Sequence, residues 1–534
     1  MSVVLTGEDL EIDDVVRVAR EAEPVEIAEE ALARVADSRA DLETRMADGE
    51  VIYGVNTGFG ALAGDRIPPE DVETLQENLL RSHAFGVGEP ADQDEVRAMV
   101  LLRLNSLLNG NSGVRERTIY ALRDLLNEGV YPHVPRKGSA SASGDLAPLA
   151  HVALVLIGEG KANVGGEWVD GKKALERAGI EPLTLKAKEG LALVNGTNYV
   201  TAVGALAVHD ARTLVESADT VGGLSLEGLA GISDAFRPEL HELRGQPGQE
   251  LSARRIRELF ADGSELVTPS ADPDDVRAAS DVQDPYSLRC MPQVHGATRD
   301  VIAHVEAVVE RELNAVTDNP LVLDDGDVVS GGNFHAQPVA LALDSLATAV
   351  AELANISERR IFNLVAGEEG GSDADGGRGN NADGGRGIDA EDDRSRGDAL
   401  PSFLVEGDRP GLNSGFMIPQ VTAAALVSEN KTLVHPSSSD SVPTSDNQED
   451  HVSMGANAAN HLQEVLDNVT TVLAIEAFAA FQALWLRDRE PGEGTQEILE
   501  RLDERIDPIE SDRFMRDDLD EVVALIEHGT FDRS

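Results

Sequence analysis

The sequence predicts a mainly α-helical protein in which an N-terminal region precedes a bundle of long helices. The 534-residue chain is 41% hydrophobic, so it can bury a sizeable core. Apolar residues follow the three-four spacing of a buried helix stripe at Val339, Leu343, Leu346, Val350 and Leu353. Helical spacing of this kind extends over five long stretches: 196–229, 295–316, 338–365, 416–434 and 453–486.

The part of the chain before residue 196 shows shorter elements separated by glycine-rich turns. We expect an N-terminal domain at 1–195 and a long-helix domain at 196–534. Alternating segments around Gly165-Gly166 predict a small hairpin. The expected elements are a strand at 2–5, helical segments up to residue 47, a loop at 51–64, helices at 68–82 and 94–108, and hairpins at 161–173 and 321–330.

One segment of the long-helix domain departs from helical patterning. Residues 367–398 are rich in Gly, Asp, Glu and Arg, and the sequence ADGGRG occurs at 374–379 and again at 382–387. Glycine-aspartate repeats are typical of calcium-binding β-rolls. This repeat lacks the apolar position that would fill such a roll, so we expect an acidic surface insertion.

The charge of the chain excludes several classes of partner. With 97 acidic and 45 basic residues, the formal net charge is −52, which argues against binding to nucleic acid or to an anionic membrane. Only seven of the basic residues are lysines. Acid-rich, lysine-poor compositions are typical of proteins from salt-loving archaea, so we expect a halophilic protein.

The sequence also predicts a soluble, cytoplasmic protein. The N-terminus has no basic start followed by a long apolar run. The most apolar stretch, 470–486, contains Glu476 and Gln482 and is short for a membrane span. Cys290 is the only cysteine, so an intrachain disulfide is impossible and we expect no cysteine-based metal site.

The distinctive chemistry lies at Ala142-Ser143-Gly144, within the segment GSASASGDLAPLAH at 138–151. The Gly144 nitrogen can approach a carbonyl at dihedral angles that other residues avoid. Its attack on the Ala142 carbonyl, with dehydrations that include loss of the Ser143 hydroxyl, would close an imidazolone ring bearing an exocyclic methylidene. Such a ring is an electrophile. An isolated tripeptide of this kind also fits an ordinary turn before a helix, with Asp145 near the N-cap.

The whole segment closely resembles the prosthetic-group segment of the aromatic amino-acid ammonia-lyases, which build a methylidene-imidazolone from Ala-Ser-Gly. Six further segments resemble the same family, in family order and over most of the chain, and are most similar to its histidine-specific branch. They are YGVNTGFG at 53–60, RSHAFGVGEP at 81–90, LVNGTN at 193–198, QDPYSLRCMPQVHGA at 283–297, GGNFHAQP at 331–338 and NQEDHVSM at 447–454.

The resemblance implies a cofactor that the chain makes itself. It would be a 4-methylidene-imidazol-5-one formed from Ala142, Ser143 and Gly144, with Ser143 as the dehydroalanine part and no external cofactor. The implied fold is that of the ammonia-lyase and fumarase-like superfamily, in which the N-terminal region carries this group. The resemblance also implies a homotetramer whose active sites draw residues from more than one subunit.

Further site residues follow from the same resemblance. Tyr53 matches the family's catalytic tyrosine, and as a base it needs surroundings that favour the phenolate. Arg289 suits a substrate carboxylate because its planar fork bonds both oxygens at once. Outside such a motif, a tyrosine like Tyr53 is more often a packing residue, and an arginine like Arg289 is more often the partner in an ordinary ion pair. The remaining residues placed near the ring or the substrate are Asn195, Gln283, Tyr286 and Phe334.

Two positions indicate the substrate. Ser82-His83 resembles the pair of histidine-specific relatives, whereas phenylalanine- and tyrosine-specific relatives usually carry Phe-Leu or His-Leu. Glu449 stands where those relatives usually carry an uncharged residue, and a carboxylate suits an imidazole better than a phenyl ring. One departure is Gln337, where many relatives carry Glu. The expected reaction is the non-oxidative deamination of L-histidine to trans-urocanate and ammonia.

The residues leave alternatives open. The chain could be a phenylalanine or tyrosine ammonia-lyase, an aminomutase, or a non-catalytic acidic scaffold that retains the fold. They also leave open whether the amine or the imidazole of the substrate adds to the methylidene, and whether a metal ion assists.

Overall fold

The computed structural model describes residues 2–270, 283–367, 399–405 and 411–532. The predicted insertion at 367–398 therefore lies outside the described residues, except for Gly367. Two compact units make up the fold, each assembled from separate stretches of sequence. The first contains Met1–His209, Ala303–Ser345 and His435–Gln463, and the second contains Asp210–Ile302, Leu346–Val434 and Glu464–Ser534.

The first unit contains the short elements that the sequence predicts for the N-terminal region. Its strands form small sheets: β1 (Val3–Leu5) with β2 (Val25–Ile27), β3 (Val87–Pro90) with β5 (Pro135–Lys137), β4 (Val130–Pro132) with β6 (Lys161–Val164) and β7 (Glu167–Asp170), and β8 (Leu321–Val322) with β9 (Val328–Val329). Its helices are α1 (Ile12–Ala19), α2 (Glu29–Ala47), α3 (Val72–His83), α4 (Gln93–Leu108), α5 (Glu116–Asn127), α6 (Leu146–Leu156), α7 (Gly171–Ala178) and α8 (Glu189–Val194).

Turn chemistry accounts for both predicted hairpins, which are confirmed. β6 and β7 pair antiparallel around Gly165 and Gly166, whose φ angles of 61° and 87° are accessible mainly to glycine. β8 and β9 pair antiparallel around Gly326, with φ of 79°. The strand expected at 2–5 is also present as β1, which pairs in parallel with β2.

Helix α4 runs through the core of the first unit. Every residue from Glu95 to Leu108 is buried, so this helix has no solvent-facing stripe. It therefore carries charged side chains, Arg97 and Arg103, into the interior, where each needs hydrogen-bond partners.

All five predicted long helices are present. They are α9 (Asn198–Gly228), α13 (Met291–Leu313), α14 (Gln337–Ala366), α15 (Met417–Leu433) and α16 (Gly455–Trp485). The division between the two units falls within α9, α13, α14 and α16. The compact units thus differ from the expected single boundary between residues 195 and 196, because these helices contribute residues to both.

Buried ion pairs join the long helices inside the second unit. Arg360 of α14 donates to the Glu476 carboxylate of α16 at 2.5 and 2.8 Å, and Ser225 of α9 donates to the same carboxylate at 2.6 Å. Arg299 of α13 donates to Asp219 of α9 at 2.5 Å. Because an unpaired buried charge is costly, these pairs favour one register of the helices.

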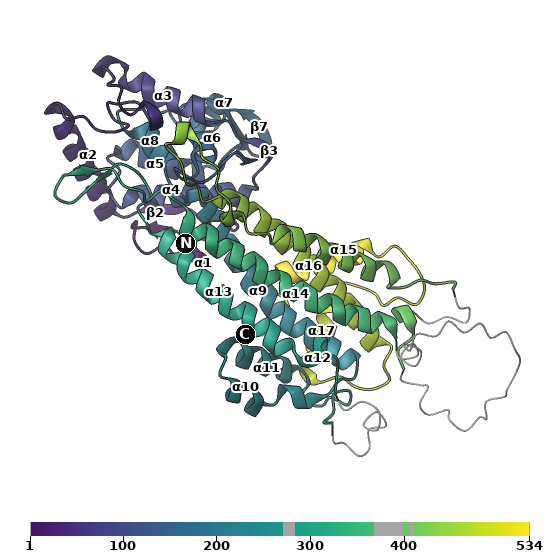
Figure 1. Ribbon diagram of the computed structural model, residues 1–534. Coiled ribbons are helices and arrows are strands. Elements are labelled where there is room, and N and C mark those ends of the chain that lie inside the picture. The colour runs from purple at the N-terminus through teal and green to yellow at the C-terminus, as the bar shows by residue number, and fades with distance from the viewer. Residues whose placement is uncertain (1, 271–282, 368–398, 406–410, 533–534) are drawn as a thin grey trace, which may run out of the picture. The chain divides into compact units, whose positions relative to one another are not determined.

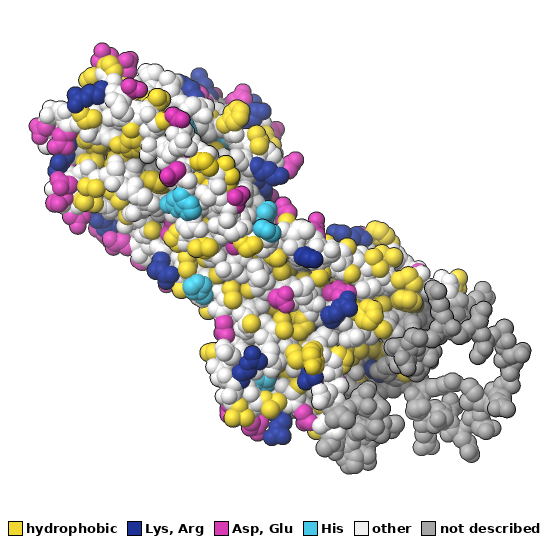
Figure 2. All heavy atoms as spheres, viewed as in Figure 1, with side chains coloured by type: hydrophobic (Ala, Val, Ile, Leu, Met, Phe, Trp, Pro, Cys, Tyr) yellow, Lys and Arg dark blue, Asp and Glu magenta, His cyan; other side chains and the backbone are white. Residues whose placement is uncertain are grey.

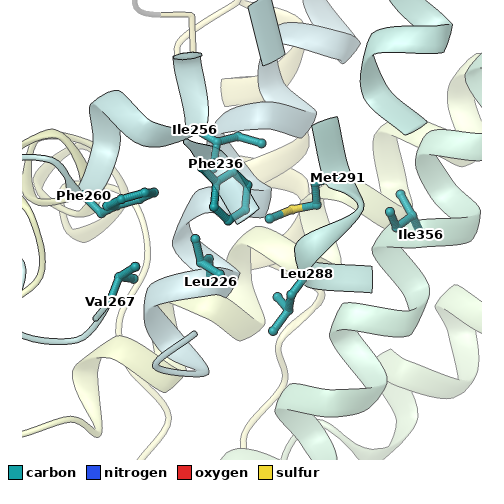
Figure 3. Packing of buried hydrophobic residues seen from close by; sticks show 8 residues of the cluster. All are labelled: Leu226, Phe236, Ile256, Phe260, Val267, Leu288, Met291 and Ile356. Atoms are coloured by element: carbon teal, nitrogen blue, oxygen red, sulfur yellow. The ribbon is translucent and has the colours of Figure 1, made fainter. Parts of the chain in front are cut away.

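A hydrophobic cluster in the second unit anchors α12 (Tyr286–Arg289). Its buried residues are Leu226, Phe236, Ile256, Phe260, Val267, Leu288, Met291 and Ile356 (Figure 3). The rings of Phe236 and Phe260 meet edge to face with centroids 5.9 Å apart. Leu288 belongs to α12, so its burial holds this short helix in place. The other helices of the unit are α10 (Pro238–Arg244), α11 (Pro247–Phe260), α17 (Glu493–Asp503) and α18 (Arg516–Glu527).

Among the described residues, two helices are long and apolar enough to cross a membrane by length and composition, α14 and α16. Within the structure, 67% and 78% of their most apolar windows are buried, as in the core helices of a folded body. Figure 2 shows acidic side chains scattered among hydrophobic ones over the visible face of each unit.

Candidate active site

The first unit contains a cavity of about 1030 Å³, a size that suits a small-molecule ligand. Residues from loops and helices far apart in sequence meet in its wall. The predicted site residues that line it are Tyr53, His83, Ala142, Ser143, Asn195, Phe334 and Glu449.

The backbone at Gly144 allows no other residue. Its φ is 74°, and a Cβ atom there would lie 2.2 Å from the carbonyl oxygen of Gly196. The same oxygen accepts a hydrogen bond from the Asp145 amide at 2.7 Å, so Gly144 and Gly196 pair as a single parallel bridge. The tripeptide therefore packs directly against the segment that follows α8.

Asp145 anchors the tripeptide from its C-terminal side. It stands at the N-cap of α6, but its carboxylate does not cap that helix. Instead it accepts hydrogen bonds from the Tyr199 and Val200 amides at 3.0 and 2.9 Å and from the Ser141 hydroxyl at 2.9 Å. Burial raises the pKa of Asp145 to about 6, since these hydrogen bonds only partly offset the loss of water.

Asn195 joins the cavity wall to the tripeptide. Its side-chain amide donates to the Ser143 carbonyl oxygen at 2.7 Å. The side-chain oxygen of Asn195 is buried and has no hydrogen-bond partner among the described residues. A buried acceptor that has no partner at a cavity wall can accept a hydrogen bond from a bound ligand.

The hydroxyl of Tyr53 is held by the backbone. The Gly60 amide donates to it at 3.0 Å, within the glycine-rich loop that the sequence predicts. A donor aimed at the phenol oxygen stabilises a negative charge there. Tyr53 is half-buried and lines the cavity, which fits the role of a base.

Glu449 lies directly beside the reactive serine. Its carboxylate accepts a hydrogen bond from the Ser143 hydroxyl at 2.5 Å, and its other oxygen accepts one from Thr444. The residue is partly buried. The structure therefore brings together two of the predicted site residues that lie 306 positions apart.

His83 presents a neutral imidazole. Burial lowers its pKa below the ordinary value of 6.5. The Ser82 hydroxyl donates to the Leu79 carbonyl oxygen at 3.0 Å and therefore accepts from the His83 Nδ1–H at 2.9 Å. In this tautomer Nε2 carries a lone pair, so His83 can accept a hydrogen bond from a ligand.

Two histidines of the cavity wall were missed by the sequence reasoning. His335 follows Phe334, and His451 lies two residues after Glu449; their rings are parallel, with centroids 5.6 Å apart and a 3° interplanar angle. Both belong to segments that carry the family resemblance, GGNFHAQP and NQEDHVSM. Their position in these two motifs could have identified both histidines as residues of the site.

Besides Gly144 of the tripeptide, three predicted residues are not among those that line the cavity: Gln283, Tyr286 and Arg289. All three belong to the second unit. Gln283 is exposed, and the Tyr286 side chain is 71% exposed. The Arg289 guanidinium lies 4.4 Å from the centroid of the Tyr286 ring, and its Nε donates to the Asp284 carbonyl oxygen at 3.0 Å.

The site fits the prosthetic group that the resemblance implies. Ala142 and Ser143 line the cavity, Gly144 has a positive φ and packing that exclude any side chain, and the Ser143 carbonyl already has a donor. Within the described ranges no cluster of three or more His, Cys, Asp or Glu side chains could hold a metal ion. The glycine-aspartate repeats considered for calcium lie outside those ranges.

The chain belongs to the aromatic amino acid lyase family, whose model matches residues 10–373 and 389–504. The gap at 374–388 falls inside the segment expected to be an insertion. Histidine ammonia-lyase of Anaeromyxobacter sp. (strain K) is 50% identical over 537 residues, which cover 99% of each chain.

Solved structures show the same fold. Histidine ammonia-lyase from Trypanosoma cruzi matches with a TM-score of 0.85 at 40% identity, covering 99% of this chain and 94% of that one. Tyrosine aminomutase from Streptomyces globisporus matches with a TM-score of 0.88 at 36% identity, covering 99% and 98%. The mainly α-helical fold class is thereby confirmed.

Proposed function

We propose that this chain is a carbon-nitrogen lyase that converts L-histidine to trans-urocanate and ammonia, the first step of histidine degradation. The observation that carries the proposal is the meeting of Ser143, Glu449 and His83 in one cavity. The histidine ammonia-lyases among its relatives, similar over nearly the whole chain, support the same reaction.

Ala142, Ser143 and Gly144 would form the 4-methylidene-imidazol-5-one, which supplies an electrophile that ordinary side chains lack. The Asn195 amide holds the Ser143 carbonyl oxygen, and the Gly196 carbonyl holds the Asp145 amide on the other side. These contacts keep the three residues in one place, so the chain orients the electrophile toward the cavity.

Tyr53 removes the β-proton of the substrate. Its hydroxyl lines the cavity, and the Gly60 amide donates to the phenol oxygen that would carry the negative charge. Phe334 lines the same cavity, and the family resemblance places it beside the ring.

Glu449 and His83 select the imidazole of the substrate. Glu449 accepts from one N–H of the protonated substrate imidazole, and the neutral His83 ring offers Nε2 as the acceptor for the other N–H. A phenyl ring would leave both groups unpaired in a partly buried site, which costs affinity.

We further propose that Gln283, Tyr286 and Arg289 complete each site from a neighbouring subunit of a homotetramer. The family resemblance is the basis for this assignment. The exposure of Tyr286 on α12 supports it, because an exposed side chain remains available to another chain. Arg289 would bind the substrate carboxylate through its two-pronged guanidinium.

From the acid-rich, lysine-poor composition we propose a halophilic enzyme of the cytoplasm, and the family resemblance implies that it needs no external cofactor. At a net charge of −52 per chain, screening by salt lowers the repulsion between subunits. We propose no nucleic acid and no membrane as partners.

The direct test supplies L-histidine, L-phenylalanine and L-tyrosine separately in molar salt and follows the ultraviolet absorbance of the conjugated acrylate product. We expect rapid formation of urocanate from L-histidine alone. Faster turnover of phenylalanine or tyrosine would contradict the substrate assignment, and a β-amino acid product would identify an aminomutase.

Intact-mass measurement tests the prosthetic group independently of substrate. Ring formation removes two water molecules from the chain, so the purified protein should be lighter than its sequence by that mass. A protein that keeps the full sequence mass and turns over none of the three amino acids would be the non-catalytic scaffold.

A further inference from the structure

Arg103 of α4 is one of the largest fully buried side chains of the described chain. Its Nη1 donates to the Asn195 carbonyl oxygen at 2.9 Å and to the Asn198 side-chain oxygen at 3.0 Å. Its Nη2 donates to the Ala192 carbonyl oxygen, near the end of α8. One guanidinium therefore holds three acceptors around the turn between α8 and α9.

The charge of Arg103 persists despite its burial. Burial lowers its pKa to about 10, and the attraction of Asp318 opposes this change. Arg103 is thus protonated at neutral pH. Asp318 itself is buried and pairs with Lys188 at 2.7 Å, so the fold maintains a charged group here at considerable desolvation cost.

The turn that Arg103 holds is the one that engages the ring-forming tripeptide. The side chain of Asn195 donates to the Ser143 carbonyl oxygen at 2.7 Å. The Gly196 carbonyl oxygen accepts from the Asp145 amide at 2.7 Å. Gly196 fits closely over the guanidinium, since a Cβ there would lie 2.5 Å from Nη1 of Arg103.

We propose that Arg103 is a positioning residue: its guanidinium fixes Asn195 and Gly196 so that they hold the tripeptide for ring closure. In ring closure the Gly144 nitrogen bonds to the Ala142 carbonyl carbon, and the Ala142 oxygen leaves as water with the amide hydrogens of Ser143 and Gly144. The Ser143 hydroxyl leaves as a second water with the Ser143 α-hydrogen.

Arg103 acts here through Asn195. A hydrogen bond to the Ser143 carbonyl oxygen withdraws electron density and makes the adjacent α-hydrogen more acidic, which favours loss of the second water. Arg103 is not among the cavity-lining residues, so substrate binding should depend on it little. The inference rests on the proposed function, because that function requires the ring.

The test compares Arg103→Lys and Arg103→Met with Arg97→Lys and Arg97→Met. Arg97 is a matched control: it lies on the same helix, is also buried, and donates to the carbonyl oxygens of Val18 and Leu126 at 2.6–3.2 Å. Intact mass, thermal midpoint, and kcat and KM for L-histidine are measured for each full-length protein in molar salt.

We expect Arg103→Met to retain the two waters in most molecules, and Arg103→Lys to rescue part of the ring with kcat lower by about ten- to a hundredfold and KM little changed. Arg97 variants should lose thermal stability but form the complete ring, with kcat within about twofold, since separate sites act independently. Two results would overturn the proposal. One is that the Arg97 and Arg103 variants lose the ring equally; the other is that the Arg103 variants form the complete ring and keep a normal kcat.

If neither Arg103 variant folds, Asn198→Ala tests the proposal instead. It removes one acceptor of the guanidinium but keeps the charge and both carbonyl contacts. Incomplete ring formation or a lower kcat supports the proposal, and wild-type mass and kcat overturn it. A wild-type protein without water loss would instead contradict the proposed function itself.

Discussion

The cavity of the first unit and the α12 segment of the second unit present functional side chains in opposite ways. Tyr53 at the cavity is half-buried, with its hydroxyl hydrogen-bonded to a backbone amide. Tyr286 on α12 is 71% exposed, and the Arg289 guanidinium lies 4.4 Å from the centroid of its ring. The cavity groups are held by their own unit, whereas α12 is anchored through Leu288 and leaves Tyr286 exposed.

This difference separates two requirements of the site. An electrophile made from backbone atoms needs a fixed backbone, which the hydrogen bonds around Ser143 and Asp145 provide. A group that binds substrate from another chain needs an anchored backbone and an exposed side chain.

Ser143→Ala should have the largest effect. Alanine has no hydroxyl to lose, so no methylidene forms, and turnover of L-histidine should fall by about 10³-fold or more. The chain should remain folded, since the contacts of Asp145 persist. Circular dichroism and intact mass provide the controls, and near wild-type turnover would refute the prosthetic group.

Arg289→Ala should lower kcat/KM by about 10²-fold or more, because two charge-assisted hydrogen bonds to the carboxylate are lost. Co-expression with Ser143→Ala is the sharper measurement. If each site combines α12 of one chain with the cavity of another, mixed tetramers should recover activity that neither variant has alone. No recovery in confirmed mixed tetramers would place both residues in one chain's site.

Lowering the salt concentration should remove most of the turnover through dissociation. The Debye length grows from about 3 Å at 1 M salt to about 30 Å at 0.01 M, so repulsion between acidic subunits extends across whole interfaces. Light scattering, circular dichroism and urocanate formation are followed together. We expect loss of the tetramer and of activity before loss of helicity; an active, intact tetramer in dilute buffer would contradict this.

Glu449→Gln and His83→Ala should each lower histidine turnover by about ten- to a hundredfold, the effect of losing one hydrogen bond to a charged group. Thermal stability should change little, because both side chains face the cavity. Glu500→Gln and His304→Ala, at exposed residues outside the cavity lining, are matched controls. Equal losses for histidine and phenylalanine turnover would show that neither residue selects the imidazole.

Replacing 367–398 with a short Gly/Ser linker should have the smallest effect. Turnover in high salt should stay within a few-fold of wild type, since loop-closure entropy changes slowly with length. Kinetics and light scattering on the shortened chain measure it. Complete loss of the folded oligomer would show that this segment supports the assembly.

Sequence alone was sufficient where the information is local. Helical periodicity predicted α9, α13, α14, α15 and α16 to within a few residues, because an apolar stripe must repeat every three to four positions to be buried. Gly165-Gly166 and Asp325-Gly326 predicted the two hairpins, because the positive φ angles that glycine allows suit tight turns. Motif resemblance predicted the cavity residues, including Ser143 and Glu449, which prove to be in contact.

Tertiary structure decided what depends on partners distant in sequence. Asp145 looked like a helix cap, but its carboxylate accepts from the amides at the start of α9, a contact that requires α6 and α9 to meet. Arg103 appeared in no motif, and only the packing of α4 against the α8–α9 turn reveals its three acceptors. Local pattern determines which elements form, whereas buried polar groups acquire their roles from the partners that folding brings to them.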